Sequence, residues 1–113
     1  MSVEAFVGNA HGDLAEVQRL LADDPTLVNA AWDWGGGDWE TALGAASHMK
    51  EREIALFLLD HGARMDVFAA AMLGYVDVVR AMLDVRPELR DAKGPHGIPL
   101  EAHASDEVLE LLR

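Results

Sequence analysis

The sequence has no cysteine, few basic side chains and no long apolar run. Without cysteine the chain can form neither disulfides nor thiolate metal sites, which fits a reducing compartment. Nine lysines and arginines stand against twenty aspartates and glutamates, a formal net charge of −11. A nucleic-acid-binding protein would normally carry a basic patch, and an anionic membrane surface would repel this chain. We therefore expect no nucleic acid and no membrane as partners, and a protein or peptide with basic rims fits better.

The absence of targeting features sets the expected location. Met1 to Gly8 contains no basic segment followed by an apolar one, so no signal peptide is predicted. The longest nearly apolar stretch, Val67 to Val76, is too short to cross a bilayer as a helix. We expect a cytoplasmic protein. Its 113 residues, half of them apolar, are enough for one domain with a modest core.

One phrase recurs along the chain, most clearly in Gly74 to Asp84. Its apolar side chains have the spacing of one helix face. They are Val76, Val79, Met82 and Leu83. Related copies occupy residues 12–21, 50–59 and 107–112. A unit that recurs in this way predicts a repeat architecture, in which neighbouring units bury one another's apolar faces.

Short inner helices are predicted to alternate with longer outer ones. The inner helices are expected at residues 2–11, 41–49, 66–73 and 99–104. The outer helices are expected at residues 14–22, 51–60, 74–84 and 106–113. Capping residues and prolines set these ends, as in Asp13, which starts a helix, and Pro25, which follows its end. Residues 26–29 are predicted to be a short extended return.

Residues 30–40 depart from the helical pattern. Gly35, Gly36 and Gly37 demand a turn, because glycine alone visits positive φ freely. All three tryptophans flank this turn, two of them with the spacing of one strand face. We predict a β-hairpin or a long finger loop. It either exposes its tryptophans or folds them over the inner helices, and Trp34 and Trp39 are the ones expected to be exposed.

Residues 41–66 carry a family resemblance. They contain Thr41-Ala-Leu-Gly-Ala-Ala, then Ile54-Ala-Leu-Phe-Leu-Leu, then Gly62-Ala. This resembles the ankyrin repeat, whose pattern is Thr-Pro-Leu-His-x-Ala-Ala, then Ile-Val-x-x-Leu-Leu, then Gly-Ala. The resemblance implies an all-α repeat solenoid of helix-turn-helix pairs with one long hairpin-like finger loop. About four ankyrin repeats would form a single domain, over residues 1–29, 30–64, 65–92 and 93–113.

The departures from the family pattern indicate a small, divergent, stand-alone member. The proline and histidine of the family are Ala42 and Gly44 in the second repeat. The spacing between copies also differs from the family period of about 33 residues. Arginine outnumbers lysine, and alanine and glycine are frequent, which is compatible with a GC-rich bacterial genome.

The resemblance implies where a partner would bind. In this family, partners contact the finger tips and the exposed pair that precedes each outer helix. By position, the pairs are Ala10–His11, His48–Met49 and Met72–Leu73. The finger and the last loop contribute Trp32, Asp33, Trp34, Asp38, Trp39, Glu40, Lys93 and His96. The first expectation is therefore a non-catalytic protein–protein interaction module, without metal or cofactor, that binds through a concave groove.

Two alternatives stay open. His11 and His48 fall in adjacent repeats, and with Asp33, Asp38 or Glu40 they could bind a metal or act as acid and base. That arrangement would make a small-molecule-binding or minor enzymatic site, although the family pattern treats these as variable surface positions. The last helix is too apolar for one narrow face, so a homodimer could form there. Its apolar residues are Val108, Leu109, Leu111 and Leu112.

Overall fold

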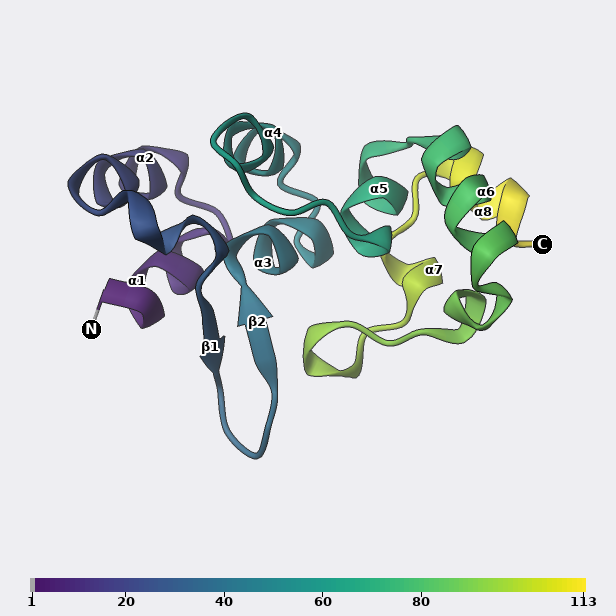
Figure 1. Cartoon of the computed structure of the whole chain (residues 1–113), viewed down its shortest axis with the longest axis horizontal. Helices are drawn as coiled ribbons and strands as arrows, with labels where there is room; N and C mark the ends of the chain where they lie inside the picture. The colour runs from purple at the N-terminus through teal and green to yellow at the C-terminus, as the bar shows by residue number, and fades with distance from the viewer. Residues whose placement is uncertain (1) are drawn as a thin grey trace.

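Figure 1 shows a computed structural model of the protein, which describes residues 2–113. These residues are mostly helical, with one small antiparallel sheet. The α-helices are α1 (Ser2–Asn9), α2 (Leu14–Asp23), α3 (Ala42–His48), α4 (Arg52–Asp60), α5 (Val67–Leu73), α6 (Val76–Val85), α7 (Leu100–His103) and α8 (Asp106–Leu112). The strands are β1 (Ala31–Asp33) and β2 (Trp39–Thr41). Three 3-10 helices are η1 (Pro25–Asn29), η2 (Pro87–Asp91) and η3 (Pro95–Gly97).

The helices lie side by side along the long axis of the molecule. The short helices α1, α3, α5 and α7 each contact the next, while α2, α4 and α6 each pack against the short helix that precedes them. The hairpin formed by β1 and β2 projects from the opposite side to α2 and α4 (Figure 1). The body measures 41 × 30 × 21 Å, so the helix pairs form an elongated array.

Side-chain caps explain where α3 and α5 begin. Thr41 accepts the backbone N–H of Gly44 at 3.0 Å, and Asp66 accepts that of Ala69 at 2.8 Å. Such caps satisfy N–H groups that have no partner inside the helix. Each predicted helix is present, with ends within two residues of those expected. The extended return predicted at residues 26–29 was wrong. Asp24 caps a 3-10 helix there, and proline starts it.

Apolar side chains form two contiguous clusters. The first joins α1 to α4 and includes the fully buried Phe6 and Leu58. The second joins α5 to α8 and includes Val79 and Leu100. Helix α5 contributes small side chains to both clusters, so it connects the two halves of the core. The recurring phrase therefore supplies core residues, as the periodicity predicted.

Much of the apolar side of the last helix, α8, is packed against the second core cluster. Val108 is fully buried, and the three leucines that follow are partly buried against the second cluster. A homodimer through this helix stays a prediction.

In residues 2–113, every helix falls short of the length and hydrophobicity that a bilayer crossing requires.

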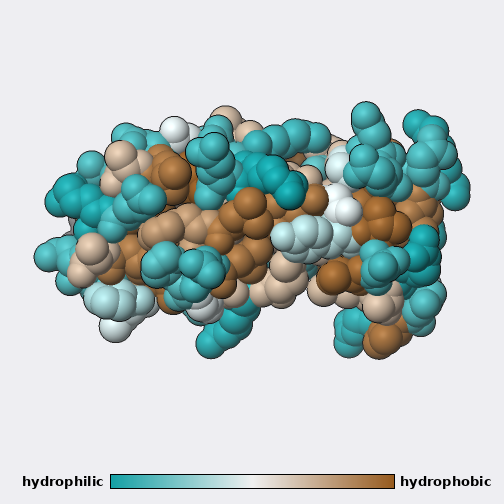
Figure 2. Space-filling view, turned by 90° about the horizontal axis from the view of Figure 1, so that it is seen from above, coloured by the Kyte–Doolittle hydropathy of each residue, from teal (hydrophilic) through white to brown (hydrophobic). Residues whose placement is uncertain are grey.

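The face formed by α2, α4 and α6 carries a mainly apolar groove. Viewed from above, it shows apolar side chains between charged ones (Figure 2). A shallow groove of about 420 Å³ is lined by Gln18, Leu21, Ala22, Pro25, Phe57 and His61. The groove is mainly apolar, whereas the ionisable side chains described below gather beside the hairpin.

A buried histidine sits in the second half of the core. His103 is fully buried, and its Nδ1 donates to the carbonyl oxygen of Pro99 at 2.9 Å. Among the described residues, its Nε2 has no hydrogen-bond partner. Burial lowers the pKa of His103, and this effect outweighs the bond to Pro99 and the charge of Asp66, which both raise it. The folded protein therefore favours the neutral imidazole.

Replacing His103 with asparagine is expected to flatten the acid limb of the stability curve. Below the unfolded pKa of about 6.5, the unfolded chain binds a proton that the folded chain resists, so stability falls as the pH falls. The slope from this group is at most about 1.4 kcal/mol per pH unit. The asparagine amide can still donate to Pro99 but does not titrate. Urea unfolding at pH 7.5, 6.0 and 5.0 measures the difference, and parallel curves for the two proteins would contradict the assignment.

Candidate metal centre

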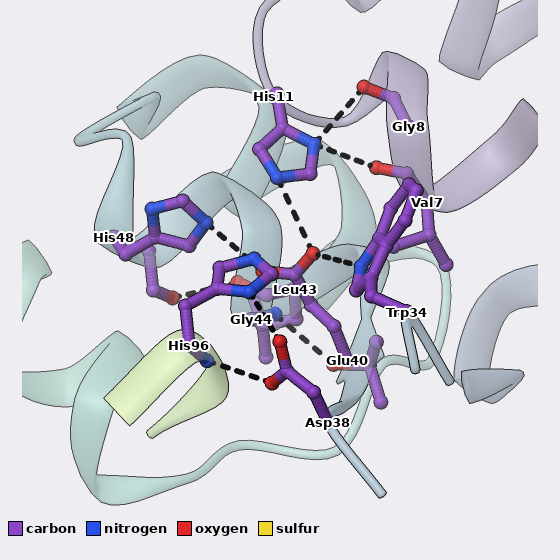
Figure 3. A network of polar contacts seen from close by, with 12 residues as sticks. Val7, Gly8, His11, Trp34, Asp38, Glu40, Leu43, Gly44, His48 and His96 are labelled. Carbon is purple, nitrogen blue, oxygen red and sulfur yellow. Dashed lines mark hydrogen bonds and ion pairs between the residues drawn. The ribbon is translucent and has the colours of Figure 1, made fainter. Parts of the chain in front are cut away.

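Histidines from three distant segments meet beside the hairpin (Figure 3). His11 follows α1, His48 is the last residue of α3, and His96 lies in η3. Glu40 of β2 reaches the same point. One ligand atom from each of the four residues lies within 4.8 Å of the others.

The hairpin places Glu40 at the centre of this cluster. The two strands pair antiparallel, with Trp32 opposite Glu40. The carboxylate of Asp33 accepts the backbone N–H groups of Gly35 and Gly37 at 2.9 and 3.1 Å, which closes the turn. All three glycines of the turn have positive φ, so the predicted glycine turn is present. Glu40 directly precedes the cap of α3 and is therefore fixed against that helix.

Glycine at position 44 makes room for the cluster. A Cβ atom at Gly44 would lie 3.3 Å from Pro95 Cγ and 3.6 Å from Glu40 Cγ. The η3 turn therefore packs directly against the first turn of α3. This close approach carries His96 from the far end of the chain to Glu40.

The Glu40 carboxylate is the hub of the contacts. Only 1% of the residue is exposed. Its Oε1 accepts the indole N–H of Trp34 at 2.9 Å and lies 3.3 Å from His11 Nε2. Its Oε2 lies 2.9 Å from His48 Nε2 and 3.3 Å from His96 Nε2. The carboxylate therefore faces three imidazoles at once.

Hydrogen bonds on the other side of two rings fix their tautomers. His11 Nδ1 lies 3.1 Å from the carbonyl oxygen of Val7 and 3.0 Å from that of Gly8. Carbonyl oxygens only accept, so Nδ1 carries the proton. His96 Nδ1 lies 2.6 Å from Asp38 Oδ2, and Asp38 Oδ1 accepts the backbone N–H of His96 at 2.8 Å. When these two rings are neutral, the Nε2 atom of each therefore carries a lone pair that faces Glu40.

This is the arrangement by which proteins orient metal-binding histidines. A ligating imidazole usually donates its second N–H to a carboxylate or a backbone carbonyl, which fixes the ring and raises its basicity. His96 has the carboxylate version of this contact, through Asp38, and His11 has the carbonyl version. The two rings are thus held with their free nitrogens toward one point.

Charge and burial act differently on the individual groups. Burial lowers the pKa of His48, and the neighbouring His11 and His96 lower it further, against the charge of Glu40. Burial also opposes the charged form of His96, but its bond to Asp38 and the charges of Glu40 and Asp38 raise the pKa of His96 overall. Hydrogen bonds from the backbone and side chain of His96 lower the pKa of Asp38. His48 therefore favours the neutral form, while His96 attracts a proton.

Two buried atoms of the cluster are poorly satisfied. In the part of the chain that the structure describes, neither Glu40 Oε2 nor His48 Nε2 makes a hydrogen bond of good geometry, although both atoms are fully buried. They lie 2.9 Å apart. Buried polar atoms without partners are costly, and a cation between them would remove the cost. Ligand atoms at bonds of about 2.1 Å around a tetrahedral ion are about 3.4 Å apart. The Glu40 oxygens lie 2.9 to 3.3 Å from the three Nε2 atoms, which is close to that separation.

The other predicted site residues have varied surroundings. Trp34 and Trp39 are 41% and 61% exposed, as expected, whereas Trp32 packs against the first core cluster. Met49 is exposed. Lys93 forms a bridge with Pro99 at the base of the last loop.

Four predicted surface positions are not on the surface. Glu40 was expected on an exposed finger, but the finger folds its carboxylate inward against α3. Ala10, Met72 and Leu73 were expected on an open groove and are buried in the first core cluster. The short connection between α4 and α5 brings these two helices together, so the end of α5 is covered.

The full cluster could not be found from spacing alone. His11 and His48 were considered as neighbours, and their ring centroids lie 5.1 Å apart. His96 was assigned to the last loop, and nothing in its local sequence indicates the contact with Asp38, 58 residues earlier. Comparison with known proteins adds no ligand set, because no protein-family model, curated protein or solved structure matches the chain significantly.

Proposed function

We propose that this protein binds a divalent transition-metal ion through His11, His48, His96 and Glu40. The observation that carries the proposal is the convergence of three imidazole Nε2 atoms on one buried carboxylate. Three nitrogens and one oxygen suit Zn²⁺, Co²⁺, Ni²⁺ or Cu²⁺. Mg²⁺ and Ca²⁺ prefer sites made of oxygen ligands. This proposal replaces the expectation of a groove without a metal.

We also propose that the scaffold is an ankyrin-type repeat array. The side-by-side helix pairs and the buried positions of the recurring phrase support this. In this interpretation the cluster lies where two fingers, the hairpin and the last loop, approach the inner helices. The ion would then join residues of the first, second and fourth repeats.

Calorimetric titration of the untagged protein with Zn²⁺ tests the metal site. We expect one ion per chain, with affinity at least about 10-fold weaker in a His48→Ala variant, because a lost ligand should cost no less than a lost outer contact. His61→Ala is the matched control. That ring is exposed, contacts the carbonyl oxygen of Phe57 and lies outside the cluster. Equal affinity in the wild type and the His48 variant would exclude the proposed site.

A protein partner is the second candidate function, favoured by one observation. Trp39 is 61% exposed at the base of the hairpin turn, and exposed tryptophan is enriched among residues that dominate binding energy. Binding of a protein partner would use Trp39, whereas binding of a metal ion would not. In the same titration, Trp39→Ala should leave Zn²⁺ binding unchanged, because successive side chains of a strand point to opposite faces, and Trp39 is exposed whereas Glu40 is buried.

A further inference from the structure

We infer that the bound ion keeps one coordination position open between His11 and His96, and that this position takes a small aromatic carboxylate beside Trp34. The inference rests on the proposed function, since it concerns the same ion. It is carried by the spacing of the rings, by the side from which solvent reaches them and by the position of Trp34.

The three imidazoles are not evenly spaced around Glu40. The ring centroid of His48 lies 5.1 Å from that of His11 and 5.2 Å from that of His96. The centroids of His11 and His96 are 6.4 Å apart. The widest gap between two of the imidazoles therefore lies between His11 and His96.

Solvent reaches the cluster on the side of that gap. The side chains of Glu40 and His48 are 0% and 9% exposed, so they form the side of the cluster that is closed to solvent. The side chains of His11 and His96 are 27% and 32% exposed. A ligand from solution would consequently approach the ion between these two rings.

Trp34 borders the same opening. Its ring centroid lies 6.2 Å from that of His11 and 6.5 Å from that of His96. The indole N–H donates to Glu40, so the ring is held at the site rather than free to turn away. With 41% of its surface exposed, Trp34 offers a flat apolar wall beside the gap.

Charge and coordination number favour an anionic oxygen donor there. A divalent ion with three neutral imidazoles and one carboxylate keeps a net charge of about +1 in its inner shell. With four protein ligands the carboxylate would be a fifth donor, and zinc sites do expand from four to five ligands. A carboxylate supplies one oxygen to the ion, and an aromatic body attached to it can pack against Trp34.

The Co²⁺-loaded protein tests this inference by visible absorption. Benzoate and acetate are titrated separately, since both carry a carboxylate and only benzoate carries a ring. We expect both to shift the ligand-field bands, with benzoate binding at least about 3-fold tighter than acetate. Trp34→Ala should remove the preference for benzoate, and Trp34→Phe, which keeps an aromatic ring, should retain most of it.

The outcomes separate this inference from the proposed function. If the wild type does not acquire the absorption of bound Co²⁺, the metal site itself is wrong. If Co²⁺ binds but neither carboxylate changes the spectrum, the site is closed and only the open position is refuted. A response to both without preference for benzoate would refute the role of Trp34.

Discussion

Replacing Glu40 with glutamine is expected to raise the dissociation constant for Zn²⁺ at least about 100-fold while the protein stays folded. Loss of an outer contact to a metal ligand already costs about 10–100-fold. Glutamine has nearly the same shape as glutamate. Its oxygen can still accept the Trp34 N–H, and its amide can donate to the unpartnered Nε2 of His48. The variant thus removes the charge at the centre of the cluster without emptying the space.

Thermal unfolding shows this effect directly. At a Zn²⁺ concentration of about 100 times the dissociation constant, the wild type should gain about 2.7 kcal/mol. For a chain of this length that raises the melting temperature by about 10 °C. The Glu40→Gln variant should show almost no shift at the same concentration.

Glu40→Ala serves as the contrasting variant. It leaves the Trp34 N–H without its acceptor, which costs about 1–3 kcal/mol in the metal-free protein. A full Zn²⁺ shift in the glutamine variant would show that the carboxylate is not a ligand, whatever the alanine variant does.

Replacing Leu58 with alanine is expected to produce the largest loss of stability among the core residues of α4. The side chain is fully buried in the first cluster. Truncating a buried leucine costs about 2–5 kcal/mol, because the lost transfer energy adds to the energy of the cavity. The melting temperature should fall by about 10–20 °C.

Leu56→Ala, on the same helix, provides the matched control. Leu56 is 37% exposed, so its truncation should cost about 0.5 kcal/mol or less. Chemical unfolding of the two variants at one pH measures the difference. Similar losses for both would mean that α4 does not bury the face that carries Leu58.

The helices could be predicted because their signals are local. The apolar periodicity of the recurring phrase, the capping residues and the three glycines of the turn each act within a few residues. The 3-10 helix at Pro25–Asn29 was missed because its short segment carries no periodicity. Its signal was the Asp24 cap beside Pro25, which the sequence contained.

The candidate site was harder to predict because its contacts are between distant segments. Asp33 and Asp38 both lie in the hairpin, yet Asp33 caps the turn and Asp38 binds His96. Asp38 has its role because the η3 turn places His96 beside it. The short sequence around Pro95 does not reveal the path of this turn. The burial of Glu40 likewise depends on which way the finger folds, and this was one of the alternatives left open.

The absence of a side chain at position 44 lets the η3 turn pack closely on α3. A Cβ at Gly44 would lie 3.3 Å from Pro95 Cγ, so a larger side chain is expected to press the turn outward. His96 would then be carried away from Glu40, and the four-residue constellation would lose a member. A residue without a bulky side chain at position 44 is therefore a condition for assembling the cluster.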